Sequence, residues 1–320
     1  MQTRSLGKTD LAIVPVVFGG NVFGWTADEA RSFELLDAFV DRGFNAVDTA
    51  DVYSTWLPGH QGGESETIIG KWLARSRNGS GKRDKVVLLT KVGMEMKSGG
   101  KGLSRKYILE EVEQSLKRLQ TDYIDLYQSH TDDQSVPLEE TLEAYAQLID
   151  AGKVRYIGAS NYKGARLAEA IDLAERKKLP AYQTLQPEYN LHDRQDYEQD
   201  LAPVAAKYGL GVIPYFSLAS GFLTGKYQSL EDAKGKKRES RVQKYFDERG
   251  MKILKALKQV STETGAEQAA VSLAWLLAQP TITAPIASAT STQQMEALFA
   301  AVELKLTAQQ VALLTDASAY

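Results

Sequence analysis

The sequence predicts an α/β fold in which eight parallel strands and the helices between them close into a (β/α)8 barrel. Short β-branched or apolar runs alternate along the chain with longer segments of helical periodicity, which is the pattern of repeated βα units. Several of the short runs are apolar throughout, as expected for strands that are buried on both faces. The expected strands are residues 16–19, 45–48, 86–91, 124–128, 154–159, 184–188, 211–215 and 281–285.

The chain opens with an expected hairpin, in which residues 3–6 and 11–14 flank a polar turn. Among the helical segments, Ser104 is a candidate N-cap, and Gly152 follows another segment as a C′ residue. The expected helices are residues 27–42, 64–75, 105–119, 138–151, 165–177, 197–208, 250–264, 268–278, 292–302 and 307–317.

An open, doubly wound sheet is the alternative arrangement for alternating strands and helices. Such a sheet would normally carry a phosphate-binding turn with GxGxxG spacing after its first strand. Residues 19–24 read GGNVFG, which is rich in glycine but lacks that spacing. The count of eight strands therefore favours the barrel.

The length of 320 residues permits either two domains or one barrel with additions. We expect a single barrel domain spanning residues 1–320. The additions are the hairpin, the loop at 54–64, the segment 217–249 and the terminal helices.

Composition excludes several classes of function. The formal net charge is −3 and the isoelectric point is near 5.8, which gives no electrostatic case for nucleic acid. The chain has no cysteine, so disulfides and thiol nucleophiles are impossible. The three histidines, His60, His130 and His192, form no closely spaced pair, and we expect no metal site. Without an apolar signal segment or a run that could span a bilayer, we expect a cytoplasmic protein with no membrane partner.

One stretch, residues 231–249, is dense in charge. Surface charge usually serves solubility, so a solvated loop is the simpler interpretation. The sharper hypothesis is a flap that contacts an anionic ligand.

Polar residues at the carboxyl ends of the expected strands indicate where chemistry would occur in a barrel. Asp48 and Lys91 end adjacent, mostly apolar strands, and a charge there is costly unless it is paired. We therefore expect a buried Asp48–Lys91 ion pair. Tyr53 follows in the loop after Asp48, and a nearby lysine should lower the pKa of its phenol. His130 follows the next strand. Together these residues would provide a proton donor, a charge that adjusts the pKa of this donor, and a polar group that orients a carbonyl oxygen.

Each of these residues alone is weak support for a site. A lone aspartate at a strand end is more often a structural contact, and a lone tyrosine more often packs. The hypothesis depends on their joint occurrence on three consecutive βα junctions.

Six motifs resemble those of the aldo-keto reductases over nearly the whole chain, closest to a bacterial branch related to potassium-channel β subunits. The motifs are FNAVDTADVY (44–53), LLTKVG (88–93), DLYQSHTDD (125–133), KVRYIGASNY (153–162), LQPEYNLHDR (185–194) and VIPYFSLASGFLTGKY (212–227).

The resemblance implies a catalytic tetrad of Asp48, Tyr53, Lys91 and His130. It implies hydride transfer from a nicotinamide to a carbonyl carbon, with Tyr53 as the general acid that protonates the forming alkoxide. Lys91, paired with Asp48, would tune Tyr53, and His130 would orient the carbonyl by a hydrogen bond.

The resemblance also implies a cofactor site. Ser160 and Asn161 match residues that bind the nicotinamide carboxamide, and Tyr215 matches the ring that stacks on the nicotinamide. Lys226 matches a cationic contact to the pyrophosphate, and Arg241 matches a basic residue of the flap. The remaining implied cofactor residues are Gly20, Asn21, Asp48, Gln186, Phe216, Ser217, Leu218, Ser220, Gly221, Ser288, Thr290 and Gln294.

The choice between NADP(H) and NAD(H) depends on the segment after the last strand. Many family members carry an arginine there that pairs with the 2′-phosphate of NADP. This chain has Thr290 and Gln294 at the candidate positions and Leu298 where asparagine is common. Hydroxyl and amide contacts also occur in the channel-β branch, which uses NADP. We therefore favour NADP(H) and keep NAD(H) as possible.

The expected partner is a small-molecule carbonyl substrate, and the oligomeric state stays open. Phe23, Trp25 and Trp56 are candidate substrate-binding residues near the barrel mouth, although surface packing of these aromatics is the simpler alternative.

Two other functions are compatible with parts of the sequence. One is a cofactor-binding regulatory subunit with slow reductase activity, disfavoured because the hairpin starts at the first residues. The other is an isomerase or aldolase with Lys91 as Schiff base, disfavoured by the Asp48 partner.

Overall fold

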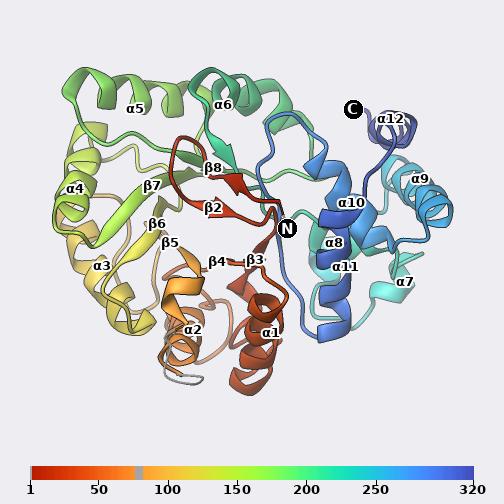
Figure 1. Cartoon of the computed structure of the whole chain (residues 1–320), viewed down its shortest axis with the longest axis horizontal. Helices are drawn as coiled ribbons and strands as arrows, with labels where there is room; N and C mark the ends of the chain where they lie inside the picture. Colours follow the sequence, from red (N-terminus) through yellow and green to blue (C-terminus); the bar gives the residue numbers. More distant parts are fainter. Residues whose placement is uncertain (1, 76–81) are drawn as a thin grey trace.

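The computed structural model describes residues 2–75 and 82–320. In this part of the chain eight parallel strands form one sheet, ordered β10-β3-β4-β5-β6-β7-β8-β9, with helices around its outside (Figure 1). The strands are β3 (Val17–Gly19), β4 (Ala46–Asp48), β5 (Val87–Val92), β6 (Ile124–Ser129), β7 (Val154–Ser160), β8 (Thr184–Gln186), β9 (Gly211–Val212) and β10 (Ile286–Ala287).

Backbone hydrogen bonds join the two end strands and close the sheet. The amide of Thr283 donates to the carbonyl of Val212 at 2.8 Å, and the amide of Ile286 donates to that of Pro214 at 2.9 Å. The expected (β/α)8 barrel is confirmed.

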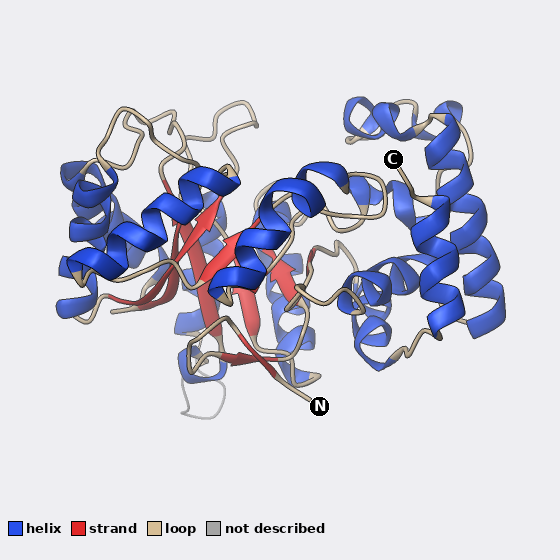
Figure 2. Ribbon diagram, turned by 90° about the horizontal axis from the view of Figure 1, so that it is seen from above, coloured by secondary structure: helices blue, strands red, loops and turns tan. Residues whose placement is uncertain are grey.

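Helices surround the barrel, and the C-terminal ones gather on one side of it (Figure 2). Neighbouring helices α1 to α6 pack against one another in order, α11 lies between α10 and α1, and α9 packs on α10 and α12. The helices are α1 (Glu29–Asp41), α2 (Glu64–Ala74), α3 (Arg105–Leu119), α4 (Leu138–Asp150), α5 (Gly164–Lys177), α6 (Ala202–Tyr208), α7 (Leu230–Ala233), α8 (Glu239–Val242), α9 (Glu248–Thr264), α10 (Gln268–Leu277), α11 (Thr292–Glu303) and α12 (Ala308–Ala317). Shorter turns are η1 (Gly20–Val22), η2 (Arg83–Lys85), the π-helix η3 (Tyr197–Leu201), η4 (Ala219–Thr224) and η5 (Gln243–Tyr245).

Local sequence fixes several helix starts. The hydroxyl of Ser104 accepts a hydrogen bond from the amide of Tyr107, which is the expected N-cap of α3. Thr307 and Gln310 form a capping box at the start of α12.

The hairpin, β1 (Arg4–Ser5) and β2 (Ala12–Ile13), closes the amino-terminal end of the barrel. Leu6 and Ile13 are buried in the barrel interior against side chains of the strands. Gly7 has a φ of +62°, and a Cβ there would lie 2.1 Å from the carbonyl oxygen of Gln183. Only glycine allows the turn to approach the barrel this closely.

The structure corrects three expected elements, all at prolines. The last strand is Ile286–Ala287 rather than 281–285, because Pro285 has no amide hydrogen to donate to a ladder. The expected strand 211–215 is a ladder only at Gly211–Val212 and is followed by Pro214. The expected helix 197–208 begins as a π-helix before α6, where Pro203 removes a hydrogen bond to the preceding turn.

Within residues 2–75 and 82–320, no single helix is both long and apolar enough to cross a membrane. The pair α11 and α12 meets the length and composition together, but the two helices are bent by 120° at their junction.

Candidate active site

The carboxyl end of the barrel brings three strand ends and one loop together. Asp48 ends β4, Lys91 lies near the end of β5, and His130 follows β6. The amide of Asp51 donates to the carbonyl of Lys91 at 3.2 Å, which continues the pairing beyond β4. The loop that carries Tyr53 is thereby held against β5.

Lys91 joins the expected tetrad into one cluster. Its ammonium donates to Asp48 Oδ2 at 2.6 Å, to the carbonyl of Thr49 at 2.7 Å and to the Tyr53 hydroxyl at 3.3 Å. The lysine is fully buried, so the paired carboxylate is what makes its charge tolerable there. The expected ion pair is present, and it lies in direct contact with the phenol.

Two buried glutamines hold the other oxygen of Asp48. Gln128 and Gln186 donate to Asp48 Oδ1 at 3.2 and 3.0 Å, and Gln186 also donates to Gln128 Oε1. Gln128 was not among the expected site residues. It pairs with Lys91 in the β5–β6 register, so an amide in an otherwise apolar strand was the signal that could have identified it.

Burial decides the protonation of this cluster. Burial raises the pKa of Tyr53, and the neighbouring charge of Lys91 offsets this only in part. Lys91 therefore lowers the pKa of the phenol as expected, but burial outweighs this effect, and the phenol holds its proton at neutral pH. Burial also works against the charge of Lys91, but Asp48 outweighs it and the pKa of Lys91 is raised.

His130 stands over the phenol as a neutral ring. Its ring centre lies 5.9 Å from that of Tyr53 in an edge-on arrangement. Burial, and then the charge of Lys91, hold the pKa of His130 well below its ordinary value. Its buried Nδ1 has no hydrogen-bond partner in the described residues. A neutral imidazole here can donate one hydrogen bond, but it does not serve as a proton reservoir at pH 7.

Three expected cofactor residues, Ser160, Asn161 and Tyr215, lie beside His130 and form a surface named the cofactor shelf. The amide of Asn161 donates to the carbonyl of His130 at 2.8 Å, and Tyr215 donates its hydroxyl to Asn161 Oδ1 at 2.8 Å. Asn161 has a φ of +56°, a conformation that asparagine tolerates better than most residues. The hydroxyl of Ser160 donates to the carbonyl of Gln186 at 2.8 Å.

The loop after β9 has the backbone of an anion-binding turn. Phe216, Ala219, Ser220 and Gly221 all have positive φ, a backbone feature of anion-binding turns. The amides of Ala219 and Gly221 donate within the turn, to the carbonyls of Phe216 and Leu218. A Cβ on Gly221 would lie 3.1 Å from the ammonium of Lys226, so the lysine lies over the turn. This ammonium has no ion pair within residues 2–75 and 82–320. The expected residues Ser217 and Leu218 belong to the same turn.

A second strip of expected cofactor residues lies at the β3 and β10 ends. The hydroxyl of Ser288 donates to the carbonyl of Gly19 and contacts Asn21 Oδ1, each at 2.7 Å. A Cβ on Gly20 would lie 2.9 Å from the carbonyl oxygen of Asp48, so this turn lies directly against the cluster.

The two side chains expected to bind the 2′-phosphate, those of Thr290 and Gln294, contact each other. Gln294 Oε1 accepts from the amide of Thr290 at 2.9 Å and from its hydroxyl at 3.2 Å. Gln294 is exposed, and its Nε2 has no partner among the described residues. Leu298 is buried in the core.

Comparison with known proteins gives the family. The family model described as the aldo/keto reductase family matches residues 15–319. The chain belongs to the aldo/keto reductase family. It is therefore an oxidoreductase of a kind that reduces carbonyl compounds with a nicotinamide cofactor, NADH or NADPH.

Relatives of this aldo/keto reductase cover most of its length. The uncharacterized oxidoreductase YrpG of Bacillus subtilis is 36% identical over 323 residues, which is 99% of this chain and 95% of that protein. Aldo-keto reductase YhdN of the same organism is 37% identical, covering 88% of this chain and 81% of that protein. A probable voltage-gated potassium channel subunit beta of Oryza sativa subsp. japonica is 34% identical, covering 92% and 89%.

An aromatic rim of this aldo/keto reductase begins at the phenol of Tyr53. The ring of Tyr53 lies 5.6 Å from that of Trp56, and Trp56 lies 5.7 Å from Trp25, both edge-on. Trp56 is 39% exposed. Phe23 was expected in this rim, but it is fully buried and stacks on Phe18 in the core, so that expectation is corrected.

The charge-dense segment contains α7, α8 and η5 and contributes to the same rim. Arg241 lies 5.8 Å from the ring centre of Trp25 and 5.9 Å from that of Phe216. Arg238 lies 5.6 Å from Trp25. Arg238 is half-buried, whereas Arg241, Lys236 and Lys237 are exposed. The flap hypothesis and the solvated-loop interpretation both stay predictions.

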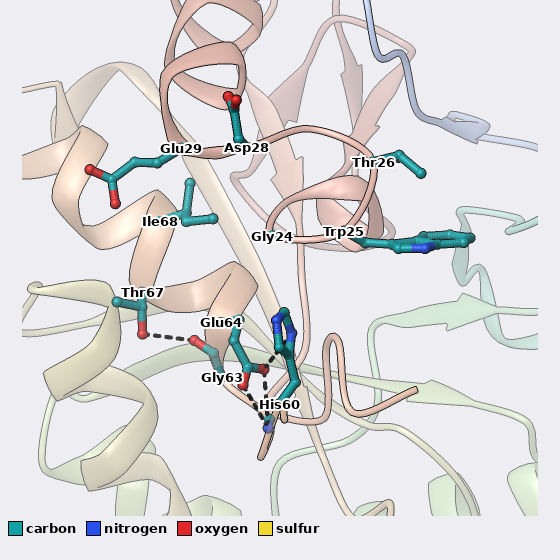
Figure 3. A pocket seen from close by; sticks show the side chains of 11 residues that line it. Gly24, Trp25, Thr26, Asp28, Glu29, His60, Gly63, Glu64, Thr67 and Ile68 are labelled. Atoms are coloured by element: carbon teal, nitrogen blue, oxygen red, sulfur yellow. Dashed lines mark hydrogen bonds and ion pairs between the residues drawn. The ribbon is translucent and has the colours of Figure 1, made fainter. Parts of the chain in front are cut away.

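A hollow of about 700 Å³ lies beside the rim, between the starts of α1 and α2 (Figure 3). His60 Nδ1 lies 3.8 Å from Glu64 Oε2 there, and the indole of Trp25 extends away from these two side chains. None of the four expected catalytic residues lines this hollow. Its lining residues are Gly24, Trp25, Thr26, Asp28, Glu29, His60, Gly62, Gly63, Glu64, Thr67 and Ile68.

A buried acidic network behind the cluster was not expected from the sequence. Arg118 pairs with Glu66 at 2.7 Å and with Glu111, and Glu66 accepts from the hydroxyl of Thr90 at 2.6 Å. Burial and the charge of Glu66 raise the pKa of Asp51 well above its ordinary value. Asp51 lies two residues before Tyr53 in the same loop.

Among the described residues, no group of three or more histidine, aspartate or glutamate side chains is arranged to hold a metal ion.

Proposed function

We propose that the chain is an NADPH-preferring reductase of aldehydes and ketones in which Tyr53 is the general acid. The observation that carries the proposal is the buried ammonium of Lys91, which contacts both Asp48 and the Tyr53 hydroxyl. This arrangement places a protonated phenol and a fixed positive charge at one point of the barrel mouth. A carbonyl oxygen that becomes an alkoxide needs both a proton and charge stabilisation.

The residues have separable roles in this proposal. Tyr53 donates its proton to the alkoxide oxygen, and the charge of Lys91 stabilises the phenolate that remains. Asp48 keeps Lys91 charged, and the two glutamines hold Asp48 in place. Neutral His130 donates a hydrogen bond to the carbonyl oxygen and sets its direction.

The cofactor, when bound, supplies the hydride. The shelf of Ser160, Asn161 and Tyr215 fits a nicotinamide amide and ring, since it offers polar groups beside an aromatic face. The turn after β9 and the unpaired Lys226 fit a pyrophosphate, because both present positive or donor groups to one place.

The preference for NADPH rests on Gln294. Its oxygen is occupied by Thr290, so its Nε2 is the atom left to donate to the 2′-phosphate. A hydrogen bond to a charged group contributes about 1.5–3 kcal/mol, and each 1.4 kcal/mol is tenfold in affinity. We expect NADPH to bind at least tenfold more tightly than NADH in a fluorescence titration of the two cofactors.

Two substitutions make this titration specific. Gln294→Leu is expected to remove most of the preference by weakening NADPH binding alone. Gln293→Leu removes the neighbouring exposed amide of the same helix and is expected to change neither affinity. Tighter binding of NADH by the unmodified protein would overturn the cofactor assignment.

A regulatory cofactor-binding subunit is the second candidate, favoured by the relative described as a probable channel β subunit. Steady-state turnover separates the two functions. A barely measurable rate over a broad panel of aldehydes, with tight cofactor binding retained, would favour the regulatory subunit.

A further inference from the structure

Two guanidinium groups at the barrel mouth have no counter-charge. Within residues 2–75 and 82–320, neither Arg238 nor Arg241 takes part in an ion pair or a side-chain hydrogen bond, although both lie over the ring of Trp25. Acidic residues nearby in the sequence are engaged elsewhere. Glu231 pairs with Lys234, and Glu239 accepts from the amide of Gly235.

Arg238 differs from an ordinary surface arginine. Its side chain is half-buried, and burial, together with the charge of Arg241, lowers its pKa. A partly desolvated guanidinium beside a like charge is unfavourable unless an anion joins it. Arginine is also the side chain best suited to hold a carboxylate or phosphate through two parallel hydrogen bonds.

The two arginines face different parts of the mouth. Arg241 also lies over Phe216, whose ring packs on Tyr215 of the cofactor shelf at 5.1 Å. Arg238 contacts Trp25 but no second aromatic ring among the described residues. Arg241 is therefore on the cofactor side, and Arg238 is on the side of the aromatic rim.

The aromatic rim connects Arg238 with the catalytic phenol. Successive steps from Tyr53 to Trp56, from Trp56 to Trp25 and from Trp25 to Arg238 measure 5.6, 5.7 and 5.6 Å. A substrate whose carbonyl lies at Tyr53 can pack its apolar body along the two indoles. Its far end then reaches the guanidinium.

We propose that Arg238 and Trp25 form a subsite for an anionic group at the end of the substrate opposite its carbonyl. The preferred substrates are then aldehydes or ketones that carry a terminal carboxylate or phosphate. This inference rests on the proposed reductase function and adds the substrate class to it.

The test compares the kcat/KM of matched charged and neutral aldehydes. One pair is 12-oxododecanoic acid and its methyl ester, and the other is 12-oxododecyl phosphate and 12-hydroxydodecanal. The chain of each is long enough to span the aromatic rim, and the two arms distinguish a carboxylate from a phosphate. The unmodified protein is expected to prefer the charged member of at least one pair by roughly tenfold or more. The arm with the larger preference identifies the anion.

Arg238→Gln is expected to abolish this preference, mainly through a higher KM for the charged substrate. Arg238→Lys should keep part of it, since the charge remains but the two-fold hydrogen bonding is lost. Lys237→Gln removes the same charge from the next position, which is exposed, and should leave the preference within about twofold because exposed charges are screened. The affinity for NADPH and the kcat/KM for the neutral aldehydes should stay unchanged in all three variants.

Three results with the variants would contradict the inference. The preference could survive Arg238→Gln, or Lys237→Gln could abolish it equally, or Arg238→Gln could weaken NADPH binding, which would assign Arg238 to the cofactor. A protein that reduces neutral aldehydes but shows no preference for charged ones would overturn this inference alone. A protein that reduces neither class would overturn the reductase function itself.

Discussion

Replacing Tyr53 by phenylalanine is expected to lower the kcat for aldehyde reduction by roughly 100- to 10,000-fold, the range typical of a lost general acid. The substitution removes only the hydroxyl, which contacts Lys91 at 3.3 Å, and keeps the ring that packs on Trp56 and His130. The stability and the affinity for NADPH should therefore change little. Steady-state kinetics with an activated aldehyde such as a nitrobenzaldehyde measures the kcat, a cofactor titration measures the affinity, and urea denaturation measures the stability.

A matched control is Tyr208→Phe. This phenol lies in α6 on the outside of the barrel, where it donates to Asp172 at 2.8 Å. Its loss removes the same chemical group without touching the site, and the kcat should stay within about twofold of the unmodified value, as for most surface changes. A Tyr53→Phe protein with unmodified turnover would show that another group supplies the proton.

Replacing Lys91 by methionine is expected to abolish detectable reduction and to destabilise the fold. The ammonium is fully buried and is the cation that contacts Asp48, so its removal leaves a buried carboxylate held by two amides. Removing one partner of a buried ion pair costs about 3–5 kcal/mol of unfolding free energy. Urea denaturation followed by circular dichroism measures this loss.

The double variant Asp48→Asn with Lys91→Met separates stability from chemistry. Both charges are then absent, so much of the lost unfolding free energy should return. The reductase activity should not return, because no positive charge remains beside the phenol of Tyr53. Activity recovered together with stability would mean that Lys91 acts only as a structural residue.

Much of the fold could be predicted because its signals are local. Buried runs such as 124–128 and the capped helix at Arg105–Leu119 appear where their composition places them. The errors occur where one residue type interrupts the backbone ladder. The last strand begins after Pro285 instead of at residue 281, and the expected helix 197–208 changes from a π-helix to an α-helix near Pro203. The apolar pattern continues through both prolines and gives no sign of these breaks.

The candidate site was predictable to the extent that strand ends meet at one face of a barrel. Asp48, Lys91 and His130 follow from that rule. Gln128 was missed because an amide inside a strand gives no periodic signal, and its role appears only in the register opposite Lys91.

The direction of the pKa shift of Tyr53 could not be predicted from the sequence. The neighbouring lysine predicts a lower pKa for the Tyr53 phenol, but the burial of this phenol raises the pKa by more. Burial depends on how side chains pack at the carboxyl end of the barrel. Phe23 was misplaced for the same reason, because its neighbour Phe18 draws it into the core.

The most direct test of the central claim is the single-turnover rate of aldehyde reduction as a function of pH. The pKa of Tyr53 is raised above its ordinary 10.0, so this acid stays protonated through neutral pH and loses its proton only in strongly alkaline solution. The pKa of His130 lies well below its ordinary 6.5, so the ring is already neutral at neutral pH and does not titrate above it. We therefore predict a rate that is constant from about pH 7 to 9 and falls only above that range. A rate that already declines as the pH rises from about 5 to 7 would make His130 the proton donor and contradict the account.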